Sequence, residues 1–248
     1  MEEVANGYFR QENLDEFNNG AAVIARVNEL TKLALRDGYL EDDAFYAGDW
    51  SLGYAQRRVF TKTYSWFIPN RTWVLSIYNY IVKNDIHSVL EVAAGTGFAA
   101  ELVTRFFKRN NPNYKLEWIC TDEEPPPRLF RSVEKCTAQQ AAENHKDCDM
   151  LFFAWWPYQG DPGDLEATES FVEKDKPVVI VGEGWGGCTG SIPFWAAATG
   201  RASWRYDPES DDEGEVPSLS IEYMDWGIDS FDGINDQTYL VSKRKMNA

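Results

Sequence analysis

Residues Ser88 to Ala99 read SVLEVAAGTGFA, and the fold class can be predicted outward from this segment. Its apolar start, VLEV, is typical of a buried parallel strand. Gly95 and Gly97 follow, and they allow a sharp turn in which backbone N–H groups come close to a ligand. The stretch therefore predicts a strand, a ligand-binding turn and the start of a helix.

The turn after this strand leaves two interpretations open. A dinucleotide-binding loop has the pattern GxGxxG, but AAGTGFAA supplies only two of its glycines. Glu91 lies at the carboxyl end of the predicted strand, and a carboxylate there suits a positively charged ligand better than a phosphate. The alternative is that the glycines serve only the packing of a strand against a helix.

The same stretch resembles motif I of class I S-adenosylmethionine-dependent methyltransferases, in which an acidic residue precedes the pattern GxGxG. Ala93 takes the place of the first glycine of that pattern. The resemblance implies S-adenosylmethionine as the cofactor, with Glu91, Ala93, Gly95 and Gly97 around its amino-acid end.

Strand-like segments recur downstream, with segments of helical length between most of them. Lys115–Asp122, KLEWICTD, follows the first strand by roughly 30 residues, which is the spacing of a βαβ unit. The other predicted strands are Asp149–Trp156, Lys176–Gly182 and a closing antiparallel pair, Leu219–Trp226 and Gln237–Ser242. This alternation predicts an open α/β sheet with mostly parallel strands. The resemblance implies the strand order 3-2-1-4-5-7-6 of a Rossmann-like methyltransferase.

The resemblance also implies roles for residues that follow the later strands. In the family, the acid that ends the second strand binds the ribose hydroxyls of the cofactor. Asp122 takes that place here, with Glu123 as the alternative. Cys136 or Thr137, which takes the place after the third strand of the family's sheet, would lie near the adenine.

The residues before the first strand predict a helical cap. Ala21–Arg36 carries apolar residues at helical spacing, with Gly38 as a stop signal, and a second helix begins after Pro69 and Asn70. We therefore divide the chain into an N-terminal cap or lid region, residues 1–84, and a Rossmann-like S-adenosylmethionine-binding domain, residues 85–248.

Aromatic residues are dense between these two helices, from Phe45 to Trp66. Aromatic side chains in such a stretch are more often core than binding residues, because each buries a large apolar area. In the resembling fold, however, the segment before the cofactor strand commonly covers the ligand. Tyr64 and Trp66 are therefore candidates for a lid over the cofactor.

Two loops should carry the substrate chemistry, because ligands of open α/β sheets lie beyond the carboxyl ends of the strands. The first, Ala154–Gln159, reads AWWPYQ and takes the position of motif IV of the resembling superfamily. It has Trp155 where an Asn or Asp would orient an amine. Its rings could stack on a planar acceptor or line a cation, so Trp155 and Tyr158 are predicted to face the acceptor.

The second loop, Gly182–Gly190, reads GEGWGGCTG and contains five glycines in nine residues. Glu183 follows the strand directly and is the candidate for a general base or an amine-binding carboxylate. The alternative is a glycine-rich turn with a solvated glutamate. Together with YSWFIP and WWPY, this loop also resembles a little-characterised group of methyltransferase-like proteins in bacteria, plants and other eukaryotes, and that resemblance implies no substrate.

The net charge of −16 is concentrated in one part of the chain. From Tyr206 to Asp236 there are eleven acidic residues and no Lys or Arg, so this stretch contributes −11 and the rest −5. A solvated acidic loop at Asp207–Val216 is the simpler interpretation. The other is a surface that attracts cationic or amine substrates. Either way, a nucleic-acid substrate is disfavoured without a basic partner.

Several other classes of protein are disfavoured by what the sequence lacks. No run of about 18 apolar residues predicts a membrane span, and the acidic first residues resemble neither a secretory signal nor a transit peptide. The four cysteines have no disulfide-scaffold spacing, which favours a cytoplasmic or a nuclear protein. The sequence has two histidines, no C-x-x-C pair and no P-loop, so we predict no metal site, no catalytic triad and no nucleotide hydrolysis.

We therefore predict an S-adenosylmethionine-dependent methyltransferase that acts on a small molecule, with amines among the candidate acceptors. Methyl transfer moves a methyl group from a sulfonium to a nucleophile, so the protein chiefly aligns the two and excludes water. Two alternatives stay open: an RNA or protein methyltransferase that works with a partner subunit, and a scaffold protein that keeps the fold without catalysis. The sequence leaves the methylated atom and the oligomeric state open.

Overall fold

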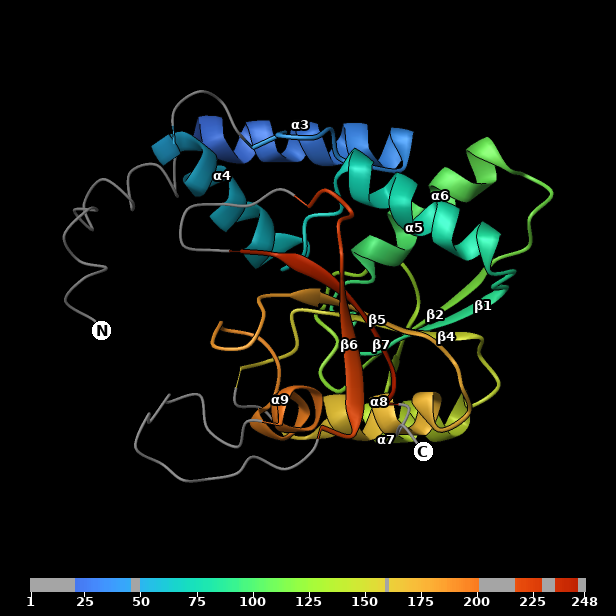
Figure 1. Cartoon of the computed structure of the whole chain (residues 1–248). Helices are drawn as coiled ribbons and strands as arrows, with labels where there is room; N and C mark the ends of the chain where they lie inside the picture. The colour runs from blue at the N-terminus through green and yellow to red at the C-terminus, as the bar shows by residue number, and fades with distance from the viewer. Residues whose placement is uncertain (1–20, 46–49, 159–160, 201–216, 229–234, 245–248) are drawn as a thin grey trace, which may run out of the picture.

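The structure, a computed structural model, describes residues 21–45, 50–158, 161–200, 217–228 and 235–244. These residues form a single seven-stranded sheet with the order β3-β2-β1-β4-β5-β7-β6 (Figure 1). The strands β1 to β5 pair in parallel, and β7 runs antiparallel to both β5 and β6. The predicted open, mostly parallel sheet and its strand order are confirmed. The strands are β1 (Ser88–Glu91), β2 (Glu117–Asp122), β3 (Val133–Lys135), β4 (Met150–Ala154), β5 (Val178–Gly182), β6 (Leu219–Met224) and β7 (Gln237–Lys243).

Helices cover both faces of the sheet, which gives the molecule three layers. Figure 1 shows α5 and α6 on one face and α7, α8 and α9 on the other. The described helices are α3 (Ala21–Asp37), α4 (Trp50–Thr63), α5 (Arg71–Lys83), α6 (Phe98–Asn110), α7 (Ala138–Asn144), α8 (Gly163–Val172) and α9 (Ile192–Thr199). Within the described ranges, every helix is too short or too polar to span a lipid bilayer.

The central strands bury side chains on both faces, as their near-continuous apolar sequences predict. Successive side chains of a strand point to opposite faces, so neighbouring residues enter different cores. Val89 and Phe152 pack in the core beneath α5 and α6, whereas Leu90 and Phe153 pack in the core beneath α7, α8 and α9. Polar groups of these strands can therefore reach solvent only at the ends of the sheet.

The first predicted helix is confirmed. Its apolar residues are buried at helical spacing, and Gly38 ends it with a left-handed backbone, φ +87°. A Cβ at Gly38 would lie only 2.7 Å from the backbone nitrogen of Phe106 on α6. Glycine is therefore required here both for the backbone angle and for the close approach of α6.

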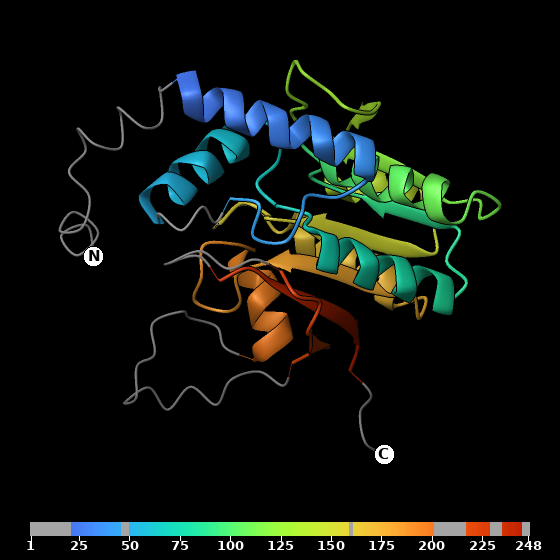
Figure 2. The ribbon, with the colours of Figure 1, turned by 90° about the horizontal axis from the view of Figure 1, so that it is seen from above.

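The aromatic-rich stretch contains a helix that the sequence did not predict, α4. Phe45, Phe60 and Tyr64 are buried in a third apolar core with Phe98 of α6, so the interpretation of these aromatics as core residues holds for them. Residues 46–49 of the stretch lie outside the described residues. Figure 2 shows α3 and α4 together at one end of the molecule, where α3 also packs against α6.

The helix α5 belongs to the sheet rather than to a separate cap. Trp73, Ile77 and Ile81 lie in the same core as Val89 and Phe152. Asn70 caps the helix by accepting a hydrogen bond from the Trp73 backbone at 2.9 Å. A boundary at residue 84 therefore does not divide the described residues into two cores, and only α3 and α4 lie beyond the layer that covers the sheet.

Replacing Gly38 by alanine tests the contact between the end of α3 and α6. Gly186 is the matched control, because it has the same φ of +87° but a Cβ there would meet nothing within 4 Å. We expect Gly186→Ala to lower the free energy of unfolding by about 1 kcal/mol through backbone strain alone. Gly38→Ala should cost about 2 kcal/mol or more, because the Phe106 backbone must also move. Equal losses in urea unfolding would contradict this account.

Candidate functional site

A cavity of about 450 Å³ opens at the carboxyl edge of the sheet, beside β1, β2 and β4. Four segments line it: the loop after β1, the end of β2, the start of α7 and the loop from β4 into α8. The predicted cofactor residues Ala93, Asp122, Cys136 and Thr137 are brought together in this lining, and so is the alternative ribose residue Glu123. Their roles remain predictions, but their shared location follows from the sheet edge on which all four segments end.

The loop after β1 is tied to the end of β2 by Asp122. One oxygen of its carboxylate accepts a hydrogen bond from the Gly95 backbone at 2.8 Å, and the other accepts one from the Glu124 backbone at 2.9 Å. A carboxylate offers about four acceptor sites, so Asp122 can still accept two bonds from a ligand. Gly97, with φ +70°, caps α6 and completes the turn, although neither glycine lines the cavity.

Ala93 lines the cavity with a left-handed backbone, φ +51°. The resembling family has glycine at this position, and alanine adopts such a backbone only at a cost of about 1 to 2 kcal/mol. The turn thus keeps the shape that a glycine would take. The methyl side chain of Ala93 is small enough to line the cavity without filling it.

The start of α7 supplies the remaining predicted cofactor residues. Thr137 caps the helix, and its hydroxyl accepts a hydrogen bond from the Gln140 backbone at 3.2 Å in a capping box. Cys136 is half-buried, and burial raises the pKa of its thiol. All four cysteines of the chain are free thiols.

The cavity lining is strongly acidic. It includes five carboxylates, from Asp122, Glu123, Glu124, Asp161 and Glu166, and none of the lining residues is a lysine or an arginine. A cavity with this lining repels phosphate groups and attracts cations. Glu124, Asp161 and Glu166 were not predicted, because nothing in their local sequence distinguishes them from solvated surface acids.

Glu91 lies elsewhere than the sequence predicted. It is the last residue of β1 and shares its face with Val89, so its side chain is buried beneath α6 instead of facing the cavity. Its carboxylate accepts a hydrogen bond from the Trp118 indole at 2.8 Å and one from the Cys120 thiol at 3.6 Å. Burial raises the pKa of Glu91 to about 7, and these two hydrogen bonds oppose the shift.

Glu91→Gln separates a structural from a ligand-binding role. A raised pKa in the folded state stabilises the protein fully below the ordinary value of 4.5, and this contribution is lost as the pH rises through about 7. We therefore expect the stability of Glu91→Gln relative to the wild type to increase by about 1 to 2 kcal/mol between about pH 6 and about pH 9. Urea unfolding at both pH values measures this.

Glu117→Gln is the matched control for this change, because Glu117 is an exposed residue of β2. It should show no such gain at high pH. If Glu91→Gln kept the pH-dependent stability of the wild type but no longer bound the ligand, a ligand-binding role for Glu91 would be supported instead.

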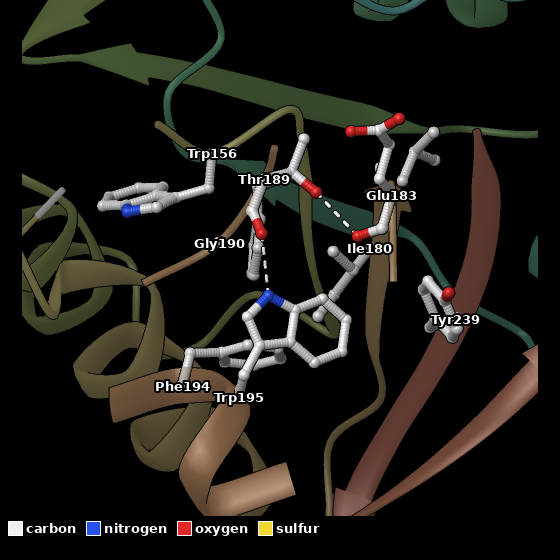
Figure 3. A pocket seen from close by; sticks show the side chains of 11 residues that line it. Trp156, Ile180, Glu183, Thr189, Gly190, Phe194, Trp195 and Tyr239 are labelled. Atoms are coloured by element: carbon white, nitrogen blue, oxygen red, sulfur yellow. Dashed lines mark hydrogen bonds between the residues drawn. The ribbon is translucent and has the colours of Figure 1, made fainter. Parts of the chain in front are cut away.

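The two loops predicted to carry substrate chemistry are joined to each other. The Gly190 backbone donates to the Trp156 carbonyl at 3.0 Å, and Pro157 and Thr189 form an isolated antiparallel bridge. Figure 3 shows the closely packed region beneath this junction, where the Trp195 indole donates to the Thr189 carbonyl at 2.7 Å. The cavity enclosed there is only about 10 Å³, which barely holds one water. This part of the sheet edge is therefore filled by the protein itself.

Glu183 holds the glycine-rich loop together. Its carboxylate accepts hydrogen bonds from the Cys188 backbone at 2.6 Å and the Asn235 backbone at 3.3 Å, and its carbonyl accepts one from the Thr189 hydroxyl at 2.7 Å. The side chain points away from Trp195 (Figure 3). A Cβ at Gly187 would lie 2.3 Å from the Glu183 Cβ, so at least this glycine is required by packing. The general-base role of Glu183 remains a prediction.

Two substitutions at Glu183 distinguish support of the loop from chemistry. Glu183→Ala leaves two backbone N–H groups without their acceptor, and we expect it to lower the free energy of unfolding by about 1 to 3 kcal/mol. Glu183→Gln can keep the shorter bond, from the Cys188 backbone, and loses only the longer one from Asn235, so it should cost less than Glu183→Ala. Denaturant unfolding of both variants measures these values. If Glu183→Ala unfolded like the wild type, the loop would not depend on this carboxylate.

Trp155 belongs to a buried polar cluster that the sequence did not predict. Its indole donates to the Asp236 carboxylate at 2.8 Å, and the Arg57 guanidinium lies 4.0 Å from the same carboxylate and 5.5 Å from the Trp155 ring. Burial raises the pKa of Asp236 to about 7, an effect that Arg57 opposes, and burial lowers the pKa of Arg57. Because the sequence did not predict α4, no local pattern marked Arg57 as a residue on a buried helix face.

The other predicted aromatic residues lie in different surroundings. Tyr64 directly follows α4, is only 3% exposed and packs between Phe60, Phe98 and Phe130. It is therefore a core residue and not a lid. Trp66 is 57% exposed and Tyr158 is 41% exposed. The acidic segment Asp207–Val216 lies outside the described residues.

Comparison with known proteins finds likenesses among solved structures. No protein-family model matches the chain, and no curated protein matches it. Among solved structures, it is similar to the apo S-adenosylmethionine-dependent methyltransferase SibL, with 10% identity, a TM-score of 0.41, and coverage of 94% of this chain and 73% of that chain. It is also similar to a "putative caffeoyl-CoA O-methyltransferase" from Staphylococcus aureus, with 12% identity, a TM-score of 0.35, and coverage of 75% and 90%. These likenesses concern the fold and assign no substrate to this chain.

Proposed function

We propose that this protein binds S-adenosylmethionine in the acidic cavity and transfers its methyl group to a small molecule. The observation that carries the proposal is the charge of the cavity: five carboxylates and no lysine or arginine line it. Such a lining disfavours nicotinamide dinucleotides and nucleoside triphosphates, which carry phosphates, and favours an adenosyl group that carries a positive charge.

The residues present fit this cofactor. Asp122 keeps free acceptor sites for ribose hydroxyls, with Glu123 beside it, and Cys136 and Thr137 lie on the wall where an adenine could rest. The turn that begins at Ala93 would border the amino-acid end. When bound, the cofactor supplies an electrophilic methyl group on a sulfonium.

The residues of the chain contribute an apolar wall that excludes water and carboxylates that attract a cationic ligand. Trp156 and Pro157 form an apolar part of the cavity wall, and such a wall keeps water from the reacting groups. The carboxylates favour a cationic ligand over its neutral product, which helps the product to leave after transfer. The same carboxylates disfavour a polyanionic acceptor such as RNA, which supports a small-molecule acceptor, with amines as candidates.

Isothermal titration with S-adenosylmethionine, S-adenosylhomocysteine and NAD⁺ tests the proposal. We expect both adenosyl compounds to bind and NAD⁺ not to bind. In the double variant Asp161→Asn/Glu166→Gln, affinity for the sulfonium compound should fall about fivefold to tenfold at low salt, while affinity for S-adenosylhomocysteine stays the same. Substitution of Asp122 would be a poorer test, because its two carboxylate oxygens hold the Gly95 and Glu124 backbones, whereas Asp161 holds only the Gly163 backbone through one oxygen, which asparagine retains.

The matched control is Glu169→Gln/Glu173→Gln, which changes the net charge equally. Glu169 lies on α8 and Glu173 caps it, but neither lines the cavity. This control should bind both compounds like the wild type. If neither adenosyl compound bound, the alternative of a scaffold protein with this fold would be favoured. If NAD⁺ bound more tightly than S-adenosylmethionine, the proposal would be overturned.

A further inference from the structure

Trp66 and Trp155 form an aromatic stack at the carboxyl edge of the sheet. Trp66 lies between α4 and α5, and Trp155 follows β4 directly. Their ring centroids are 5.8 Å apart, and the ring planes differ by 21°. Trp66 is 57% exposed, so one side of the stack is open to solvent. A large exposed tryptophan at a ligand-binding edge needs an explanation, because such residues are usually buried.

Trp155 forms a rigid base for this stack. Its backbone donates to the Val181 carbonyl at 2.8 Å, and its indole donates to the buried Asp236 at 2.8 Å. Arg57, also buried, lies against the ring at 5.5 Å. Trp155 has φ +55°, which is rare for a bulky residue and costs of order 1 to 3 kcal/mol at the sites where it occurs. These contacts therefore hold the strained backbone of Trp155, and with it the ring, in a fixed position.

The stack lies next to the acidic cavity. Trp156 and Pro157, the two residues after Trp155, line the cavity. Ala93 also lines the cavity, and its neighbour Ala94 packs, as Trp155 does, against the core beneath α5 and α6. The stack and the cavity wall are thus connected through consecutive residues of the loop after β4.

We propose that the exposed side of Trp66 stacks the methyl acceptor, and that this acceptor is a planar aromatic compound without negative charge. The inference rests on the proposed function, for which it names the substrate class. A flat ring gains most from an offset stack on an indole, because both the buried area and the ring quadrupoles favour it.

The charges around the stack decide against an anionic ring. Five carboxylates line the adjoining cavity, and Asp236 and Glu183 are buried nearby on the β7 and β5 sides. Arg57 lies against the inner ring, Trp155, and is itself paired with Asp236. Carboxylates outnumber guanidinium groups among the charges named here, and this excess favours a neutral or cationic ring over a carboxylated one.

Three probes test the inference on the full chain: tryptamine, 2-cyclohexylethylamine and indole-3-acetate. The first two compare a planar and a saturated ring with the same charge, and the third has a planar ring with a negative charge. By isothermal titration or ligand-observed NMR, we expect tryptamine to bind at least roughly tenfold more tightly than either of the others. Equal binding of all three, or binding of none, would overturn the inference.

Substitutions locate the binding on Trp66. Trp66→Ala should weaken tryptamine binding roughly tenfold, and Trp66→Phe should weaken it by less than about threefold, because a ring remains. Tyr223→Ala is the matched control, since Tyr223 on β6 is equally exposed at 58%, and it should bind tryptamine like the wild type. Unchanged melting temperatures would confirm that all three variants fold, and an unchanged affinity in Trp66→Ala would overturn the inference.

This inference and the proposed function fail separately. If S-adenosylmethionine binds but tryptamine does not, the substrate class is wrong and the cofactor assignment stands. If tryptamine binds through Trp66 but neither adenosyl compound binds, the aromatic site stands and the proposed methyl transfer is wrong.

Discussion

The burial of both faces of β1, β4 and β5 is the constraint on which the rest of the structure depends. Helices cover each face, and alternate side chains fill the two cores completely. A parallel strand covered in this way can present polar groups to a ligand only beyond its end. The cavity, the glycine-rich loop and the tryptophan stack consequently all lie at the carboxyl edge. Glu91 shows the converse, because it is still within the strand and is buried with its face.

Buried charges connect the N-terminal helices to this edge. Arg57 on α4 and Asp236 before β7 are 179 positions apart in the chain, yet they meet beside Trp155. Burying such a pair costs desolvation energy, and removing one partner would leave the other charge uncompensated. The cluster therefore links the position of α4 to the position of the Trp155 ring. Stability and the shape of the proposed acceptor site depend on the same contacts.

The acidic cavity and the stack of Trp66 on Trp155 lie in neighbouring parts of the proposed site. The acidic cavity selects against phosphates, and the stack beside it offers a flat apolar surface to a ring. The loop after β5, by contrast, satisfies its own polar groups through Glu183 and Thr189. Five glycines in one loop suggest ligand contact, but several of these glycines lie where a Cβ would overlap a neighbouring side chain. The open cavity of the sheet edge, and with it the proposed cofactor site, is therefore on the side near β1, β2 and β4.

The main strands, α3 and α5 could be predicted from the sequence, because they depend on periodicity and turn residues within short segments. The strand order and the shared location of Ala93, Asp122, Cys136 and Thr137 were implied by the resemblance to a known family. It did not predict α4, whose aromatic residues obscure the polar–apolar pattern, or the three-residue edge strand β3, which is mostly exposed. The burial of Glu91 and Tyr64, the contact of Arg57 with Asp236 and the stack of Trp66 on Trp155 became visible only in the folded chain. Those positions depend on which distant segment packs against each side chain, and local sequence patterns carry no information about that choice.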